Sequence, residues 1–210
     1  MRATWPKALW VFLVTGEFGI PTVYKPSETI RTLRRLFAGY NLLNRQIRML
    51  KNTIQAMLAE DGVTVGTTDR SRLFKGNESV TDDILSDHHL LQVIVEALQI
   101  QVDLLRTITE SKDHLGRKIV EASAPLDEQI RLLITIPGIT PLTASAFLAD
   151  VGDVHRFPSL RRMNAYLGLV PRCHDSGGKS RPGHITRESR KLSRTILTQS
   201  IYQTIKGTPG

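Results

Sequence analysis

The sequence predicts a mainly α-helical protein: a long antiparallel coiled-coil hairpin, followed by a small helical domain that contains a helix-hairpin-helix. Two long segments repeat apolar residues at alternating steps of three and four, which is typical of a heptad seam. Beyond residue 125 the apolar segments become short, and Pro and Gly separate them. We therefore expect domains at residues 1–26, 27–124 and 125–210.

The amino-terminal run ALWVFLV, residues 8–14, is apolar. It follows Arg2 and Lys7, as in a signal peptide, but Glu17 interrupts it and no small-residue cleavage site comes next. We expect a buried helix here and no membrane span, because a span requires roughly 18 apolar residues. The single cysteine, Cys173, permits no internal disulfide, so we expect a cytoplasmic protein.

A long helix is predicted over residues 28–60. Ser27 can cap its amino terminus, and Glu28 stands in the first turn, next to the positive end of the helix dipole. The helix should end at Asp61-Gly62 and be about 50 Å long at about 1.5 Å per residue. Its predicted seam consists of Ile30, Leu33, Phe37, Tyr40, Leu43, Ile47, Leu50, Ile54 and Met57.

A second long helix is predicted from a cap at Thr81 to the break at Ala124-Pro125. Each apolar stripe needs a partner, so the two helices can form an antiparallel hairpin or share the seam between two subunits. We therefore expect a homo-oligomer that assembles through the coiled coil. The second stripe consists of Ile84, Leu91, Val95, Leu98, Val102, Leu105, Ile108, Leu115 and Ile119.

The segment from residue 130 to 151 has the outline of a helix-hairpin-helix. An apolar helix runs into the turn PGITP, and a helix of small residues leaves it. In this motif a glycine turn exposes backbone N–H groups at the start of the second helix, where the positive dipole end holds a DNA phosphate. Gly138 and Thr140 are the predicted contacts, with Thr140 where a second glycine is usual. The alternative is an ordinary helical corner with Pro141 at the first helical position.

Positive charge is concentrated near the carboxyl terminus. Residues 153–210 contain eleven Lys or Arg and three Asp or Glu, and the resulting +8 equals the net charge of the whole chain. Clustered positive charge indicates a polyanionic partner, and nucleic acid is the commonest one inside cells. A solvated basic surface is the alternative. The predicted DNA-binding cations are Arg161, Arg162, Arg172, Lys179, Arg181, Arg187, Arg190, Lys191 and Arg194.

These cations fall on two predicted helices and a loop. The segment SLRRMNAYLGLVPR predicts a short helix with Arg161 and Arg162 that ends at Gly168, and a final helix is predicted from about Arg187. Between them lies the loop CHDSGGKSRPGHITR. Its GGKS resembles the end of a P-loop, but that motif requires a glycine where the chain has Cys173.

Ser176 of this loop is a candidate nucleophile for attack on a DNA phosphodiester. Gly177 and Gly178 let the backbone approach the substrate, and Arg172, Lys179 and Arg181 can hold the phosphoryl oxygens on which negative charge builds. The proton acceptor could be Asp175, His174 or His184, and the residues alone do not choose among them. A basic glycine loop that only grips phosphate is the alternative.

The order of these parts resembles a known family. The sequence IPGITPLTASAFLADVGDVHRFPSLRRMNAYLGLVPR, followed by SGGKSRPGHITRESRKLSR, closely resembles the carboxyl-terminal transposase domain of the insertion-sequence family that includes the Piv invertase. KNTIQAMLAEDG resembles that family's central coiled coil, so the resemblance covers nearly the whole chain. It implies DNA transposition or site-specific recombination, with Ser176 as the serine nucleophile and a structured guide RNA, or bridge RNA, as a further partner.

The resemblance also implies an amino-terminal RNase H-like domain whose four acidic residues, the DEDD set, bind divalent metal. Here ALWVFLVTGEFGIPTVY resembles only its last helix and exit strand, so we expect residues 1–26 to be a remnant of that domain. We expect no metal ligand or cofactor in this chain, and a divalent metal only with a complete acidic domain. The expected protein is a truncated or inactive transposase; a non-catalytic, dimerising nucleic-acid-binding regulator is the alternative.

Overall fold

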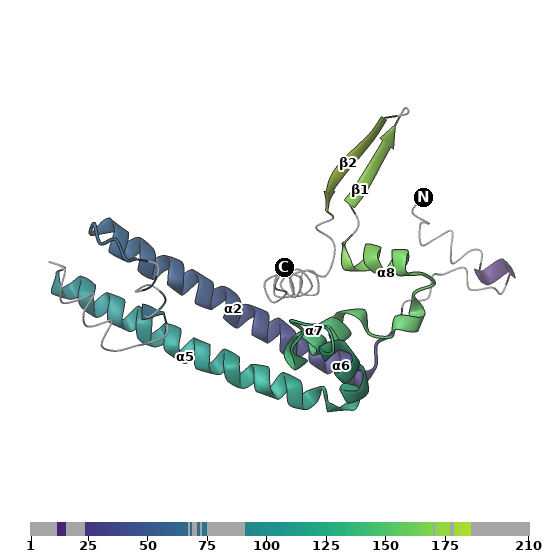
Figure 1. The fold of residues 1–210 in the computed structure, drawn as a ribbon, viewed down its shortest axis with the longest axis horizontal. Coiled ribbons are helices and arrows are strands. Elements are labelled where there is room, and N and C mark those ends of the chain that lie inside the picture. The colour runs from purple at the N-terminus through teal and green to yellow at the C-terminus, as the bar shows by residue number, and fades with distance from the viewer. Residues whose placement is uncertain are drawn as a thin grey trace.

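The fold is mainly α-helical, as the heptad stripes predict (Figure 1). The computed structural model describes residues 12–15, 24–66, 68, 71, 73–74 and 91–169, and the backbone of residues 171–176 and 179–185. None of the helices within these ranges is long and apolar enough to cross a membrane. The elements are α2 (Glu28–Glu60), α5 (Gln92–Ala122), η1 (Ala124–Leu126), α6 (Asp127–Ile134), α7 (Pro141–Val151), η2 (Val154–Arg156), α8 (Leu160–Leu167), β1 (Pro171–Ser176) and β2 (Lys179–Ile185).

Helix α2 begins and ends where the sequence predicts. The Ser27 hydroxyl accepts a hydrogen bond from the Ile30 N–H at 3.4 Å, so Ser27 is the cap. Toward the end of the helix Leu58 is buried and Met57 is only half-buried. A straight helix has about 3.6 residues per turn, whereas a strict heptad pattern assumes about 3.5. Over the length of α2 this difference moves the buried position by about one residue, from Met57 to Leu58.

Helix α5 follows the predicted second stripe from Gln92 onward. The predicted cap at Thr81 and the start of that stripe lie outside the described residues. The helix ends at Ala122, just before the Ala124-Pro125 break, and η1 continues the chain. Near this end the Lys118 ammonium, 2.8 Å from the carboxylate of Glu121, holds the pKa of that carboxyl below its ordinary value.

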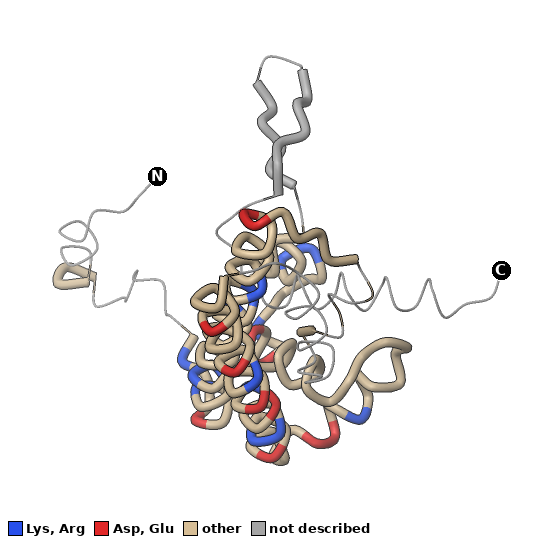
Figure 2. Tube along the Cα trace, turned by 90° about the vertical axis from the view of Figure 1, so that its left-hand side faces the viewer, with Lys and Arg blue, Asp and Glu red and all other residues tan. Residues whose placement is uncertain are grey.

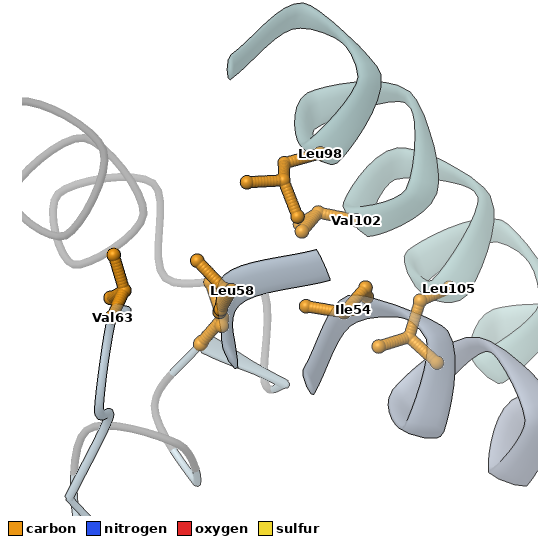
Figure 3. Packing of buried hydrophobic residues seen from close by; sticks show 7 residues of the cluster. Ile54, Leu58, Val63, Leu98, Val102 and Leu105 are labelled. Atoms are coloured by element: carbon orange, nitrogen blue, oxygen red, sulfur yellow. The ribbon is translucent and has the colours of Figure 1, made fainter. Parts of the chain in front are cut away.

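The two long helices lie side by side and run antiparallel (Figure 1). The late part of α2 packs against the early part of α5, where Ile54 and Leu58 meet Leu98, Val102 and Leu105 (Figure 3). At the other end, the early part of α2 meets the late part of α5 together with α7. That second cluster consists of Leu33, Phe37, Ile119, Ala146 and Ala149.

Small residues let α7 approach this hairpin closely. Its Ser145 hydroxyl lies 3.0 Å from the Ser123 hydroxyl at the end of α5, and both side chains are fully buried. Ser123 donates to the Val120 carbonyl oxygen at 2.7 Å, so these buried hydroxyls have partners. Helix α7 is therefore anchored by polar contacts as well as by its alanines.

Two expectations differ from the structure. Residues 12–15 are helical, but Leu13 is 74% exposed and Val14 is 62% exposed, so a buried helix is wrong for this stretch. Helical periodicity is local, whereas burial requires a packing partner. The predicted loop also contains two strands, β1 and β2, which pair as an antiparallel hairpin on either side of Gly177-Gly178. These strands are polar, so no apolar alternation marks them in the sequence.

Candidate nucleic-acid interface

The turn between α6 and α7 is an exposed corner with a capped second helix. Gly138 has φ 82°, a conformation that favours glycine, and Pro141 is the first residue of α7. Thr140 is the cap: its hydroxyl accepts from the Thr143 N–H at 3.3 Å, and its own N–H donates to the Thr143 hydroxyl at 2.7 Å. Thr140 therefore caps α7 at the position where the expected motif has a glycine. The N–H groups of Thr140 and Thr143 are both hydrogen-bonded within the turn.

Helix α8 carries Arg161 and Arg162 in its first turn. Ser159 caps the helix by accepting from the Arg162 N–H at 3.4 Å, and Gly168 ends it with φ 69°, as predicted. Both arginines are exposed, and the first turn contains no acidic residue. Cations at the positive end of a helix repel the dipole, so this end of α8 favours an anion.

The carboxyl end of α7 is covered by side chains from distant parts of the chain. Arg34 of α2 donates from Nε to the Ala149 carbonyl oxygen at 2.7 Å and from Nη2 to that of Asp150 at 3.2 Å. The Tyr166 hydroxyl of α8 donates to the same Asp150 oxygen at 3.3 Å. The last carbonyls of a helix have no partner within it, so these donors satisfy them and join three helices.

Arg156 lies in the connection between α7 and α8 and belongs to the same cluster. Its Nε donates to the Val151 carbonyl oxygen at 3.1 Å. Three aromatic rings surround its guanidinium, those of Tyr24, Phe157 and Tyr166. Sequence reasoning counted Arg156 only as one of many positive charges. The Phe at the next position was the one local signal of a ring contact.

The β1–β2 hairpin brings the predicted nucleophile and a predicted cation to paired positions. Ser176, the last residue of β1, pairs with Lys179, the first residue of β2. His174 pairs with Arg181, and the Cα atoms of paired residues in such ladders lie about 5 Å apart. Arg172 lies on β1 where the register is irregular. Figure 1 shows this hairpin beyond α8, away from the long helices.

The predicted contacts do not gather at one point. Gly138 and Thr140 precede α7, whereas Arg161 and Arg162 follow it, and α7 alone is about 16 Å long. Along duplex DNA this length corresponds to about five base pairs. Helix α5 carries basic and acidic residues mixed along its length, whereas the charged residues of α2 are mostly Lys and Arg (Figure 2). The remaining predicted cations, Arg187, Arg190, Lys191 and Arg194, lie outside the described residues.

A metal site was not expected in this chain. Within the part of the chain that the structure describes, no group of three or more His, Cys, Asp or Glu side chains could hold a metal ion.

Comparison with known proteins identifies the carboxyl-terminal region. Residues 130–209 match the family described as "Transposase IS116/IS110/IS902 family". The chain is 29% identical over 187 residues to a probable family 20 transposase of Pseudomonas aeruginosa, which covers 89% of this chain and 54% of that protein. A transposase for insertion sequence element IS1111A of Coxiella burnetii is 38% identical over 78 residues, 37% of this chain and 21% of that protein.

A third relative is named for gene inversion. The pilin gene-inverting protein of Moraxella bovis is 35% identical over 104 residues, which are 43% of this chain and 32% of that protein. The chain spans about half the length of the Pseudomonas relative and a smaller share of the other two. The matched family region contains the α6–α7 turn, α8 and the β1–β2 hairpin.

Proposed function

Because residues 130–209 match the IS116/IS110/IS902 transposase family, we propose that the chain binds DNA through residues 130–206 during transposition or site-specific recombination. Ser176 serves as the nucleophile of strand transfer when a complete partner subunit supplies the acidic metal site. The observation that carries the proposal is the family match over residues 130–209, a region that also holds most of the excess positive charge.

The geometry of α8 supports phosphate binding. Arg161 and Arg162 stand at the positive end of a helix, where a phosphate relieves the repulsion between the guanidinium groups and the dipole. Gly138 and Thr140 stand at the amino-terminal end of α7. There the N–H groups of Thr140 and Thr143 are hydrogen-bonded within the turn, so the arginines of α8 carry the phosphate contacts of this proposal.

The proposed chemistry is a phosphoryl transfer. The Ser176 oxygen forms a bond to phosphorus while the bond from phosphorus to one strand's oxygen breaks, and the hydroxyl proton passes to Asp175, His174 or His184. The leaving oxygen takes up a proton and becomes a free hydroxyl. Lys179, Arg181 and Arg172 stabilise the charge on the phosphoryl oxygens. A divalent metal on the partner's acidic residues would supply further stabilisation of that charge.

A covalent DNA adduct tests the role of Ser176. The chain is mixed with a full-length relative, that relative's guide RNA and labelled target DNA, and the protein is separated under denaturing conditions. We expect an adduct on this chain that disappears in Ser176→Ala and persists in Ser180→Ala, a matched change in the same hairpin. An adduct that survives Ser176→Ala would eliminate Ser176 as the nucleophile. Salt-sensitive binding without an adduct in any mixture identifies the alternative, a non-catalytic nucleic-acid-binding regulator.

We also propose a homo-oligomer, with a guide RNA as a further partner. The hairpin seam is filled within one chain, so assembly must use outer faces. On α2, Leu42 and Met49 are 47% and 68% exposed, and Arg45 lies one turn from each. On α5, Val93 and Ile100 are both 65% exposed, and Glu96 lies between them. Each stripe is apolar and contains one charged residue, Arg45 on α2 and Glu96 on α5. The stripe on α2 of one copy can therefore pack against the stripe on α5 of another, with these opposite charges facing each other.

Sedimentation at several protein concentrations tests this assembly. Met49→Glu should shift the chain toward the monomer, because it adds a negative charge to the face that meets the acidic stripe of α5. Thr53→Glu, on the same exposed surface one turn away, is the milder control. A chain that is monomeric at every concentration, even before substitution, would contradict the proposed oligomer.

A further inference from the structure

The cage around Arg156 connects the long hairpin to the helix that carries Arg161 and Arg162. The guanidinium carbon of Arg156 lies 4.8 Å from the ring centre of Tyr24, 4.1 Å from that of Phe157 and 4.3 Å from that of Tyr166. Tyr24 lies four residues before the start of α2, and Tyr166 belongs to α8. One side chain therefore contacts both parts of the molecule at once.

The geometry of this cage requires an arginine. A planar guanidinium can stack against several rings while its Nε donates to a carbonyl oxygen, whereas the compact ammonium of a lysine cannot do both. Arg156 does both, since Nε donates to Val151. A second guanidinium nitrogen, Nη2, is buried without a hydrogen-bond partner, so ring contacts rather than further hydrogen bonds hold the group.

These contacts join α8 to the rest of the described chain, and Leu167 at its end is also buried. The helix is only eight residues long, and the other described helices offer it little packing. Besides the cage, the described contacts of α8 with α7 include the hydrogen bond from the Tyr166 hydroxyl to Asp150. Phe157 and Tyr166 also pack ring against ring, with centroids 5.2 Å apart.

We propose that Arg156 and Tyr166 are positioning residues: they hold α8 against the carboxyl end of α7 and thereby set where Arg161 and Arg162 meet a phosphate backbone. The second half of this statement rests on the proposed DNA binding. Neither residue needs to touch the nucleic acid, because the guanidinium of Arg156 is enclosed by rings and the Tyr166 hydroxyl is bonded to Asp150.

Amide hydrogen exchange of the whole chain tests the first half without any ligand. Arg156→Lys keeps the charge but loses the planar stack and the Nε donor, so exchange across residues 160–167 should become roughly 5- to 30-fold faster. Tyr166→Phe keeps the ring and loses one hydrogen bond, so its effect should be smaller. Amides of α5 should exchange as in the wild type in both variants, which shows that the chain is still folded.

DNA binding at several salt concentrations tests the second half. Arg156→Lys should weaken binding several-fold while the salt slope stays unchanged, because no phosphate-contacting charge is lost. Arg161→Gln is the matched control: it should lower the slope by about one and leave exchange in α8 unchanged. In the double variant the loss should be smaller than the product of the single losses, since Arg156 acts through α8.

The possible failures are distinct. Unchanged exchange in α8 for both Arg156→Lys and Tyr166→Phe overturns the proposal. Faster exchange with unaltered DNA affinity overturns the link to Arg161 and Arg162. If the wild-type chain binds no DNA, the proposed function fails, and that link fails with it; faster exchange in the variants would then support only the structural half, that Arg156 and Tyr166 hold α8 on α7.

Discussion

Arg34 and Ala149 are 115 residues apart in sequence, yet the Arg34 Nε donates to the Ala149 carbonyl oxygen at 2.7 Å. The same guanidinium also reaches the carbonyl of Asp150. A cation at this place interacts favourably with the negative end of the α7 dipole and satisfies carbonyls that the helix itself leaves without donors. Helix α2 thus holds the carboxyl end of α7 in position through the Arg34 side chain.

Removing this contact should destabilise the fold. Arg34→Met keeps an unbranched side chain that suits a helix but removes both donors, and we expect a loss of about 1.5–3 kcal/mol in the free energy of unfolding. Urea unfolding followed by circular dichroism measures it. Arg35→Met, an exposed change at the next position of α2, should alter stability by less than about 0.5 kcal/mol. Equal losses in the two variants would show that the carbonyl contacts contribute nothing.

Gly152 should not tolerate a side chain. It has φ 67°, and an added Cβ would lie 3.1 Å from the hydroxyl oxygen of Tyr24. Gly152→Ala should therefore cost about 2–4 kcal/mol from backbone strain together with crowding. Gly62→Ala is the matched control, since Gly62 has φ 75° and open space around it, and should cost only about 1 kcal/mol. Thermal unfolding of both variants checks the difference.

The buried hydroxyl pair should show coupling. Ser145→Ala leaves the Ser123 oxygen without its buried donor and should cost about 1 kcal/mol, and Ser123→Ala should cost a similar amount. The double variant should lose less than the sum, because no unsatisfied partner remains. Unfolding free energies of the four proteins form the cycle. Strictly additive losses would mean that the two hydroxyls do not interact.

The hairpin seam should be sensitive on one face of α5 only. Leu98 is 1% exposed and Ile100 is 65% exposed. Leu98→Ala should destabilise the chain by about 2–5 kcal/mol, whereas Ile100→Ala should cost less than about 0.5 kcal/mol in a dilute, monomeric sample. Denaturant midpoints compare the two. A large loss for Ile100→Ala under these conditions would contradict the described packing.

The arginines of α8 should control the salt dependence of DNA binding. If Arg161 and Arg162 each contact one phosphate, the double change to Gln should reduce the slope of log affinity against log salt by about two. Arg45→Gln, which removes an exposed charge from α2, should leave that slope unchanged. Fluorescence anisotropy with a labelled duplex measures both. An equal reduction in the two proteins would mean that binding depends on net charge alone.

Much of the fold was predictable because its signals are local. Ser27 and Thr140 cap helices with hydroxyls that bond N–H groups three residues away, and Gly168 ends α8 in a left-handed conformation. Each of these effects depends on a few neighbouring residues. The two stripes also predicted that α2 and α5 each need an apolar partner, and the structure selects the antiparallel hairpin within one chain over a seam shared between subunits.

The candidate site was less predictable. The sequence predicted Gly138, Thr140, Arg161 and Arg162 as DNA contacts, but how far apart they lie depends on the path of the chain from α7 to α8. The β1–β2 hairpin was missed because polar strands carry no apolar alternation, and Gly177-Gly178 was interpreted as part of a loop. The role of Ser176 stays a prediction.

The sequence by itself determined both ends of α2, the carboxyl ends of α5 and α8, the heptad stripes and the position of the excess positive charge, because capping, periodicity and charge are properties of neighbouring residues. Only the tertiary structure decided which side chains close the carboxyl end of α7 and surround Arg156. Arg34, Tyr24 and Tyr166 come from distant segments, and no local pattern distinguishes them from other exposed arginines and tyrosines. Their partners are backbone carbonyls and the Arg156 guanidinium, and these groups come close to them only when the chain folds, so no sequence pattern predicts the contacts.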